Sequence, residues 1–205
     1  MMPQSVPKTG QPKRRVNWPK GMPQIVALLL VLVVDSLVAP HFYQIVLQEG
    51  RLFGSPIDIL NRAAPVALLA IGMTLVILTG GIDLSVGAVA GICGMVAGAL
   101  LTNGLPLWNG SVIFFNVPEV ILCVALFGVL VGFVNGAVIT RFGVAPFICT
   151  LGMMYVARGS ALLFNDGSTY PNLNGMEALG NTGFSTLGSG TVLGIYLPIW
   201  LMIAF

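Results

Sequence analysis

Charged residues are scarce in this sequence, and their scarcity decides its broad class. Only 8% of the 205 residues are Asp, Glu, Lys or Arg, whereas 56% are hydrophobic. Soluble domains carry about 25% charged residues, so a soluble globular class is excluded. The composition predicts an all-α integral membrane protein, built as a polytopic bundle of transmembrane helices.

Histidine and cysteine are also rare, which excludes several kinds of site. His41 is the only histidine, and the three cysteines form no Cys-x-x-Cys pair. A zinc site needs about four closely spaced ligands, so we expect no metal site and no disulfide framework. Cys93, Cys123 and Cys149 lie in apolar runs, where cysteine behaves as a small buried hydrophobe.

The sequence also lacks the motifs of an enzyme. A single histidine at a membrane edge cannot supply a Ser/His/Asp arrangement, so no catalytic residues are expected. No Gly-x-x-x-x-Gly-Lys-Ser/Thr phosphate-binding loop is present. We therefore expect the chain to bind no cofactor, and any ATP that drives transport to be hydrolysed by a separate subunit.

Six apolar runs predict about six membrane spans in a domain that covers residues 22–205. The predicted spans are 22–39, 63–79, 86–102, 117–139, 146–164 and 192–205. Pro65 would then lie in the first turn of the second span, where proline is tolerated. The last run has 14 residues, or about 21 Å of helix, against a hydrocarbon core of about 30 Å. We therefore expect the chain to be the N-terminal part of a longer transporter, truncated in its last span.

Basic residues are concentrated before the first span. Five of the nine precede it: Lys8, Lys13, Arg14, Arg15 and Lys20. The positive-inside rule therefore predicts that residues 1–21 form a cytoplasmic tail. A signal peptide is the alternative, but the 22–39 run is longer than a typical signal core. Alternation of sides places residues 165–191 outside, as a solvated periplasmic loop long enough to be functional.

One segment between the second and third spans is out of place in a membrane. It reads Gly80-Gly81-Ile82-Asp83-Leu84-Ser85-Val86-Gly87. A charge near mid-bilayer costs about 2.5–3.5 kcal/mol, and broken backbone at that depth is tolerated only inside protein or beside a water-filled cavity. We predict a broken or re-entrant segment near 80–87 that lines a solute path, with Gly80, Gly81 and Gly87 as its helix-break residues.

Asp83 and Ser85 are the first candidates for a role in that path or its gate. Asp83 could line the path or could be a plain N-cap of the third helix, and the two roles are compatible. Three polar residues of later spans are further candidates: Asn135, Thr150 and Arg158. The arginine needs a partner such as Asp166, backbone carbonyls or water. The glycines Gly128, Gly132 and Gly136 indicate close helix packing.

Several motifs taken together resemble a known family. They are residues 61–87, Gly132-Phe133-Val134-Asn135-Gly136, the stretch 146–152 and Arg158-Gly159. The chain resembles the permease subunits of ribose-type monosaccharide ABC importers. Its first 90 residues resemble in particular the galactofuranose-importer branch, and the likeness to that branch weakens beyond about Gly91.

The resemblance implies a subunit that passes a monosaccharide across the bacterial inner membrane by alternating access. It implies three partners: an ABC ATPase, a second permease subunit in a homo- or heterodimer, and a periplasmic sugar-binding protein. No nucleic-acid partner is expected. The alternatives are a branched-chain amino-acid-type ABC permease, an ion-coupled secondary transporter and a non-functional truncated fragment.

Overall fold

The computed structural model describes residue 19 and residues 21–48, 50–170 and 173–205. Two compact units make up the chain, one ending at Gln44 and the other running from Ile45 to Phe205. This division falls inside the predicted 22–205 domain. The five basic residues that led to a cytoplasmic tail lie outside the described residues.

The first unit contains one apolar helix, α1 (Met22–Val38), which begins with a proline in its first turn and has none of its side chains buried. A helix that is apolar all round is typical of a membrane span. After the helix the chain turns back, and the Tyr43 hydroxyl donates a hydrogen bond to the Leu32 carbonyl, 3.2 Å away.

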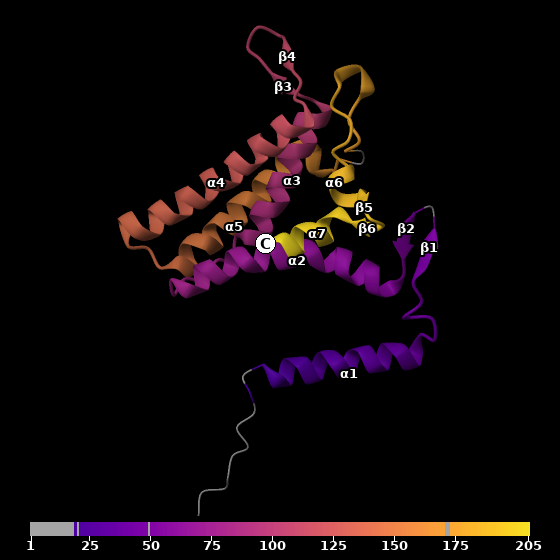
Figure 1. The fold of residues 1–205 in the computed structure, drawn as a ribbon. Helices are drawn as coiled ribbons and strands as arrows, with labels where there is room; N and C mark the ends of the chain where they lie inside the picture. The colour runs from indigo at the N-terminus through magenta and orange to yellow at the C-terminus, as the bar shows by residue number, and fades with distance from the viewer. Residues whose placement is uncertain (1–18, 20, 49, 171–172) are drawn as a thin grey trace, which may run out of the picture. The chain divides into compact units, whose positions relative to one another are not determined.

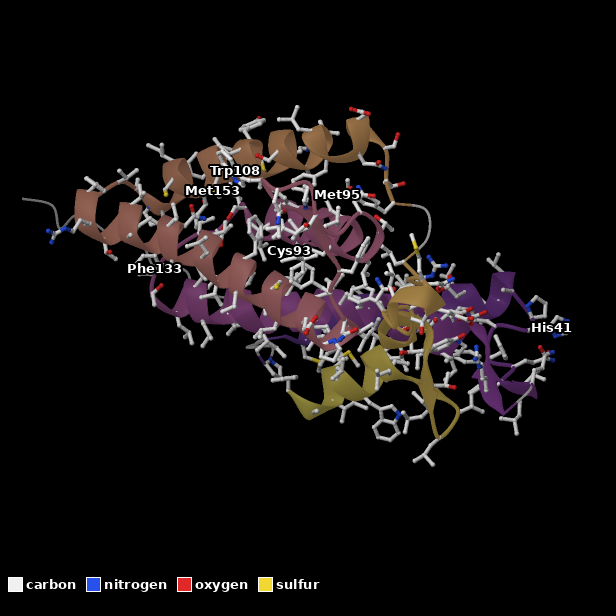
Figure 2. The ribbon with its side chains drawn as sticks, turned by 90° about the horizontal axis from the view of Figure 1, so that it is seen from above. His41, Cys93, Met95, Trp108, Phe133 and Met153 are labelled. Atoms are coloured by element: carbon white, nitrogen blue, oxygen red, sulfur yellow. The ribbon has the colours of Figure 1, made fainter. Side chains whose placement is uncertain are left out.

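The second unit is built around α3 (Val86–Thr102), which packs against both α4 (Val117–Phe142) and α5 (Pro146–Leu163). A further pair, α2 (Ser55–Leu78) and α7 (Leu197–Ala204), also pack together (Figure 1). Apolar side chains stand outward from the helices, as Phe133 does with 71% of its surface exposed (Figure 2). Such outward apolar faces suit lipid.

Three helical segments are long and apolar enough to cross a membrane: Ser55–Leu78, Val117–Phe142 and Pro146–Gly167. Two shorter apolar helices, α1 and α3, accompany them. The predicted all-α, multi-pass membrane fold is thereby confirmed.

Strands occur only in short connecting hairpins within the described residues. The three antiparallel pairs are β1 (Val46–Gln48) with β2 (Arg51–Phe53), β3 (Leu105–Pro106) with β4 (Val112–Ile113), and β5 (Thr191–Val192) with β6 (Ile195–Tyr196). The segment between α5 and β5 adds three short turns of helix: η1 (Phe164–Gly167), η2 (Glu177–Leu179) and α6 (Thr186–Ser189).

Two predicted helix starts are wrong. Helix α2 begins at Ser55, eight residues before the predicted start, so Pro65 lies in its interior rather than in its first turn. Proline has no N–H, so the Asn61 carbonyl loses its helical hydrogen bond there. The last helix begins at Leu197 rather than at residue 192, because residues 191–196 form the β5–β6 hairpin.

The core lies at the end of α3, and residues 165–191 help to build it. Ala97, Leu101 and Val120 are buried there, with Leu173 and Phe184 packed against them. The prediction of a solvated loop is therefore wrong for part of this segment. Hydrophobic side chains interrupt its polar sequence and fold it over the end of the helix.

Two further contacts fasten this segment to α3. Asn181 is fully buried, and its amide group donates to the Leu101 carbonyl at 3.0 Å. The same side chain accepts a hydrogen bond from the Met176 N–H at 2.6 Å. The ring of Tyr170 occupies the space that a side chain at Gly98 would need. Glycine at this position therefore permits the close approach of the loop.

Candidate functional site

A break in the backbone separates α2 from α3. Gly80 has a φ of 76°, its N–H donates to the Ile77 carbonyl at 2.9 Å, and the Gly81 N–H donates to the Val76 carbonyl at 3.1 Å. These bonds form a Schellman cap, which requires a left-handed residue and favours glycine. The predicted broken segment is present. Gly87, however, is the second residue of α3 and takes no part in the break.

Asp83 holds the turn that leads into α3. Its Oδ1 accepts hydrogen bonds from the Ser85 N–H at 2.7 Å and from the Ser85 hydroxyl at 2.6 Å. The N-cap position itself is occupied by Ser85. Asp83 is therefore not the N-cap residue, but it fixes the conformation of the residue that is, as Asp side chains do in Asx turns.

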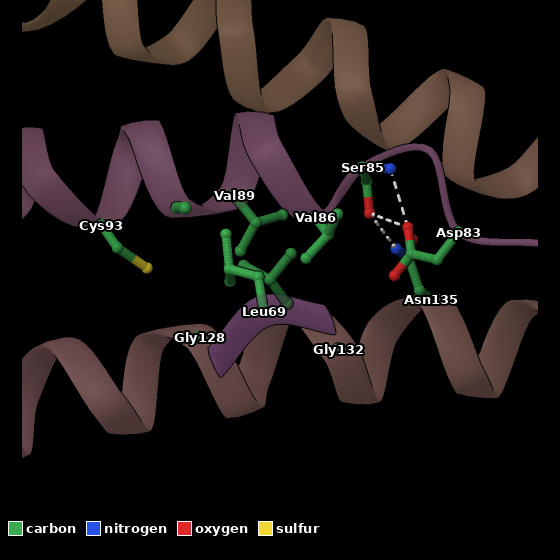
Figure 3. A pocket seen from close by; sticks show the side chains of 11 residues that line it. Leu69, Asp83, Ser85, Val86, Val89, Cys93, Gly128, Gly132 and Asn135 are labelled. Atoms are coloured by element: carbon green, nitrogen blue, oxygen red, sulfur yellow. Dashed lines mark hydrogen bonds between the residues drawn. The ribbon is translucent and has the colours of Figure 1, made fainter. Parts of the chain in front are cut away.

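Asn135 connects this turn to α4. Its amide group donates to the Ser85 hydroxyl at 3.1 Å, so a continuous chain of hydrogen bonds runs from Asp83 through Ser85 to Asn135 (Figure 3). Ser85 is 1% exposed and Asn135 is 7% exposed. The Cys149 thiol on α5 adds weak contacts of 3.7 Å to the carbonyl and side-chain oxygens of Asn135.

Thr150 fastens the break to α5. Its hydroxyl lies 3.2 Å from the Ile82 carbonyl and 2.8 Å from the carbonyl of Pro146 in its own helix, and the residue is buried. The structure thus brings together Asp83, Ser85, Asn135 and Thr150, four of the five polar residues predicted from sequence. They come from three separate parts of the chain.

The break lies inside the bundle rather than at its end. Asn135 precedes the last residue of α4 by seven positions, or about 10 Å at 1.5 Å per residue. Thr150 follows the start of α5 by four positions, or about 6 Å. The 17 residues of α3 span only about 25 Å for the same reason.

Two cavities meet at this cluster. The first, of about 290 Å³, lies among α2, α3 and α4 (Figure 3) and is lined by Leu69, Asp83, Ser85, Val86, Val89, Ala90, Cys93, Gly128, Val131, Gly132 and Asn135. The second, of about 440 Å³, reaches toward the start of α5 and includes Thr79, Gly81, Ile139, Thr140 and Thr150 in its lining. Asp83, Gly132 and Asn135 line both. Small-molecule pockets enclose about 300–1,000 Å³.

Arg158 lies apart from this cluster. It lines a third hollow, of about 390 Å³, with Leu84, Gly87, Ala88, Gly91, Met154 and Ala161. Its side chain is exposed, and in the described part of the chain it forms no ion pair with Asp166. That carboxylate lies on η1, in a residue with a φ of 53°. Of the three kinds of partner considered for Arg158, the carboxylate of Asp166 is therefore not used in the described part of the chain.

Sequence reasoning missed some residues of the site. The glycines assigned to helix packing, Gly128, Gly132 and Gly136, line one or both of the two cavities. Their four-residue spacing puts them on the same face of α4 as Asn135, which is the signal that could have identified them. Cys149 carried no such signal. No cluster among the described residues could hold a metal ion.

Comparison with known proteins identifies related sequences. Residues 55–205 match the model of a family described as "Branched-chain amino acid transport system / permease component". A galactofuranose transporter permease protein from Escherichia coli (strain K12) is 53% identical over 204 residues, covering 100% of this chain and 54% of the relative. The similarity to that relative thus spans the whole chain, not only its first 90 residues.

Other relatives carry the names of other solutes. A ribose import permease protein from Haemophilus influenzae is 33% identical over 86% of this chain and 48% of the relative. A fructose import permease protein from Bifidobacterium longum is 35% identical over 83% of this chain and 45% of the relative. The chain spans about half the length of these curated relatives. No solved structure matches it.

Proposed function

The chain belongs to the family of permease components of branched-chain amino acid transport systems, and from this premise we propose that it is a membrane-spanning subunit of an ABC importer for a monosaccharide. The match to the family covers residues 55–205, which include the break and the residues that line both cavities. The names of the relatives, for galactofuranose, ribose and fructose, support a sugar as the solute.

The observation that carries the proposal is the polar cluster at the break. Asp83, Ser85 and Asn135 form a hydrogen-bonded chain between apolar helices. All three line the first cavity, and Asp83 and Asn135 also line the second. Burying such groups away from water costs free energy unless they have partners. In a path for a hydroxylated solute these groups could bind the solute, because sugar hydroxyls both donate and accept hydrogen bonds.

The family description also names branched-chain amino acids, which makes an amino-acid permease the second candidate. The lining of the two cavities favours the sugar. Asp83 is the one ionisable carboxylate in that lining, and the lining includes no Lys or Arg among the described residues. A free amino acid is a zwitterion: its ammonium group could pair with Asp83, but its carboxylate would find no cation in this lining, whereas a neutral sugar leaves no charge without a partner.

The importer assignment entails partners and a location. We propose that this subunit pairs with a second permease, that a separate ATPase hydrolyses ATP at the cytoplasmic face, and that a periplasmic binding protein delivers the sugar. The chain itself would bind no cofactor. Its location would be the bacterial inner membrane, with the N-terminus in the cytoplasm.

Uptake by an Asp83→Ala variant tests the proposal. Cells that express the chain with its ATPase and binding-protein partners should accumulate labelled sugar, and Asp83→Ala should lower the rate about tenfold, equivalent to about 1.4 kcal/mol of lost interaction. Asp83→Asn keeps an acceptor for Ser85 and should retain more uptake than the alanine variant. Asp58→Ala is the matched control, because Asp58 is an exposed carboxylate in the first turn of α2.

Unchanged uptake in Asp83→Ala at normal membrane expression would contradict the role of Asp83. Uptake that persists without any ATPase and collapses with an ion gradient would instead indicate a secondary transporter. Competition by leucine but not by sugars would favour the amino-acid permease.

A further inference from the structure

We propose that the Ser85–Asn135 hydrogen bond is a closed gate that separates two compartments of the solute path. This inference rests on the proposed transport function and adds the position of the barrier and the bond that holds it shut. The first compartment is the cavity that contains Cys93, and the second is the cavity that contains Thr140. We call them the Cys93 cavity and the Thr140 cavity.

The two cavities are stacked along the bundle. On α4, Gly128 lines the Cys93 cavity, Thr140 lines the other, and Asn135 lies between them and lines both. On α2 the order is the same, with Leu69 in the Cys93 cavity and Val76 in the Thr140 cavity. The linings on the two helices thus place the cavities one after the other along the bundle, and on α4 the cavities meet between Gly132 and Asn135.

The bond between Asn135 and Ser85 is the connection that closes this boundary on the α4 side. Asp83 and Ser85 belong to one short segment, so their mutual hydrogen bonds survive any movement of that segment as a unit. The Asn135 amide instead reaches across from another helix, over 3.1 Å. Separation of the break from α4 therefore requires the loss of this bond.

The break has the properties of a movable element. Residues 81–84 belong to neither helix, and the Thr150 contact on the α5 side is made through a hydroxyl already bonded to the Pro146 carbonyl at 2.8 Å. Opening would leave Ser85 bonded to Asp83 and would free the Asn135 amide to donate to a passing hydroxyl. The polar groups thus have partners in the closed and the open state.

Cys93 provides a native reporter for the gate. A membrane-impermeant methanethiosulfonate reagent that carries a trimethylammonium group is applied from the side of the Thr140 cavity, in inverted membrane vesicles of the assembled importer without ATP. Modification of Cys93 is measured by peptide mass spectrometry. A Thr140→Cys variant, measured in the same way, reports the access of the reagent to the Thr140 cavity.

In the wild-type chain we expect slow modification of Cys93 and rapid modification of Thr140→Cys. Asn135→Ala, which removes the bond, should raise the rate at Cys93 about tenfold or more. Ser85→Ala should do the same and serves as the second variant if Asn135→Ala does not accumulate. Thr102→Ala removes a hydroxyl at the opposite end of α3, where it bonds to the Gly98 carbonyl, and should leave the rate unchanged.

Equal Cys93 rates in the wild type and in both gate variants would overturn the inference, as would wild-type modification of Cys93 as fast as that of Thr140→Cys. Either result, together with ATP-dependent sugar uptake, would reject the gate and leave the proposed function standing. Gated access of Cys93 in a chain that supports no sugar uptake would reject the proposed function instead.

Discussion

At the scale of single residues, two buried asparagines hold the two ends of α3. Asn135 donates to the Ser85 hydroxyl at its beginning, and Asn181 donates to the Leu101 carbonyl near its end. Both are nearly inaccessible, at 7% and 0% exposure. A buried polar side chain in such a position favours arrangements that give it a hydrogen-bond partner, because burial without one costs free energy.

Replacement of Asn181 should test this at the end of α3. Asn181→Ala leaves the Met176 N–H and one bonding position of the Leu101 carbonyl without a side-chain partner, and we expect a loss of about 1–3 kcal/mol of stability. Thermal unfolding of the purified protein in detergent measures it. Asn103→Ala is the control, because Asn103 is exposed and makes a long bond of 3.4 Å to Tyr170. An equal effect of the two variants would contradict the anchoring role of Asn181.

At the scale of elements, the glycine turn at the end of α2 is the most demanding piece of backbone. Gly80 adopts a φ of 76°, which costs other residues about 1–2 kcal/mol. The Schellman cap then directs the chain away from α2 and into the space between α4 and α5. The placement of Asp83 and Ser85 in the site therefore depends on this single turn.

Two glycine-to-alanine changes, one in the turn after α2 and one inside α2, distinguish the requirement for positive φ from ordinary helix propensity. Gly80→Ala should destabilise the protein by about 1–2 kcal/mol, because alanine is strained at positive φ. Gly72→Ala lies in the interior of α2 with open space around it and should stabilise the helix by up to about 1 kcal/mol. The melting temperatures of the two variants should thus shift in opposite directions. A stable, fully active Gly80→Ala would refute the requirement for a left-handed residue.

Hydropathy alone located every major helix, but it misplaced two helix starts for identifiable reasons. Residues 55–62 are helical although Asp58 and Arg62 interrupt the apolar run. The β5–β6 turn has positive φ at Leu193 and Gly194, and leucine is not one of the residues typical of such a turn. By hydropathy alone, an apolar hairpin of this kind is indistinguishable from a continuation of the helix.

The candidate site was only partly predictable. Asp83 and Ser85 stand out locally, because a carboxylate and glycines interrupt an apolar region. Asn135 and Thr150 lie 50 and 68 positions away from their partners in the break, and a single sequence does not show that these positions meet. The sequence also does not show that Arg158 lies apart from the cluster, because its position depends on which face of α3 is covered by α5.

At the scale of the whole molecule, the β3–β4 hairpin and the α4–α5 turn lie at opposite ends of α4 (Figure 1). Because α4 has 26 residues, or about 39 Å at 1.5 Å per residue, its two ends reach opposite surfaces of the membrane. We propose that this end lies on the cytoplasmic side, because Arg141 is in the last turn of α4 and the positive-inside rule favours basic residues there.

Introduced cysteines at these two ends should report opposite sides. An impermeant thiol reagent should modify Asn109→Cys, in the exposed β3–β4 turn, in spheroplasts with an intact inner membrane. It should modify Phe142→Cys, at the exposed end of α4, only after that membrane is permeabilised. Modification of both from one side would contradict the spanning of α4, and the reverse pattern would contradict the orientation.

The position of the break changes the electrostatic problem that a solute faces. The break lies about 10 Å in from the end of α4, and the Thr140 cavity extends from it toward that end. Water in this cavity would carry the high-dielectric medium toward the break, so the dehydrated stretch of the path would be shorter than the full hydrocarbon core of about 30 Å. The free-energy barrier to a polar solute would then be confined to a thinner layer. A small movement of a few residues would be sufficient to open a path through that layer.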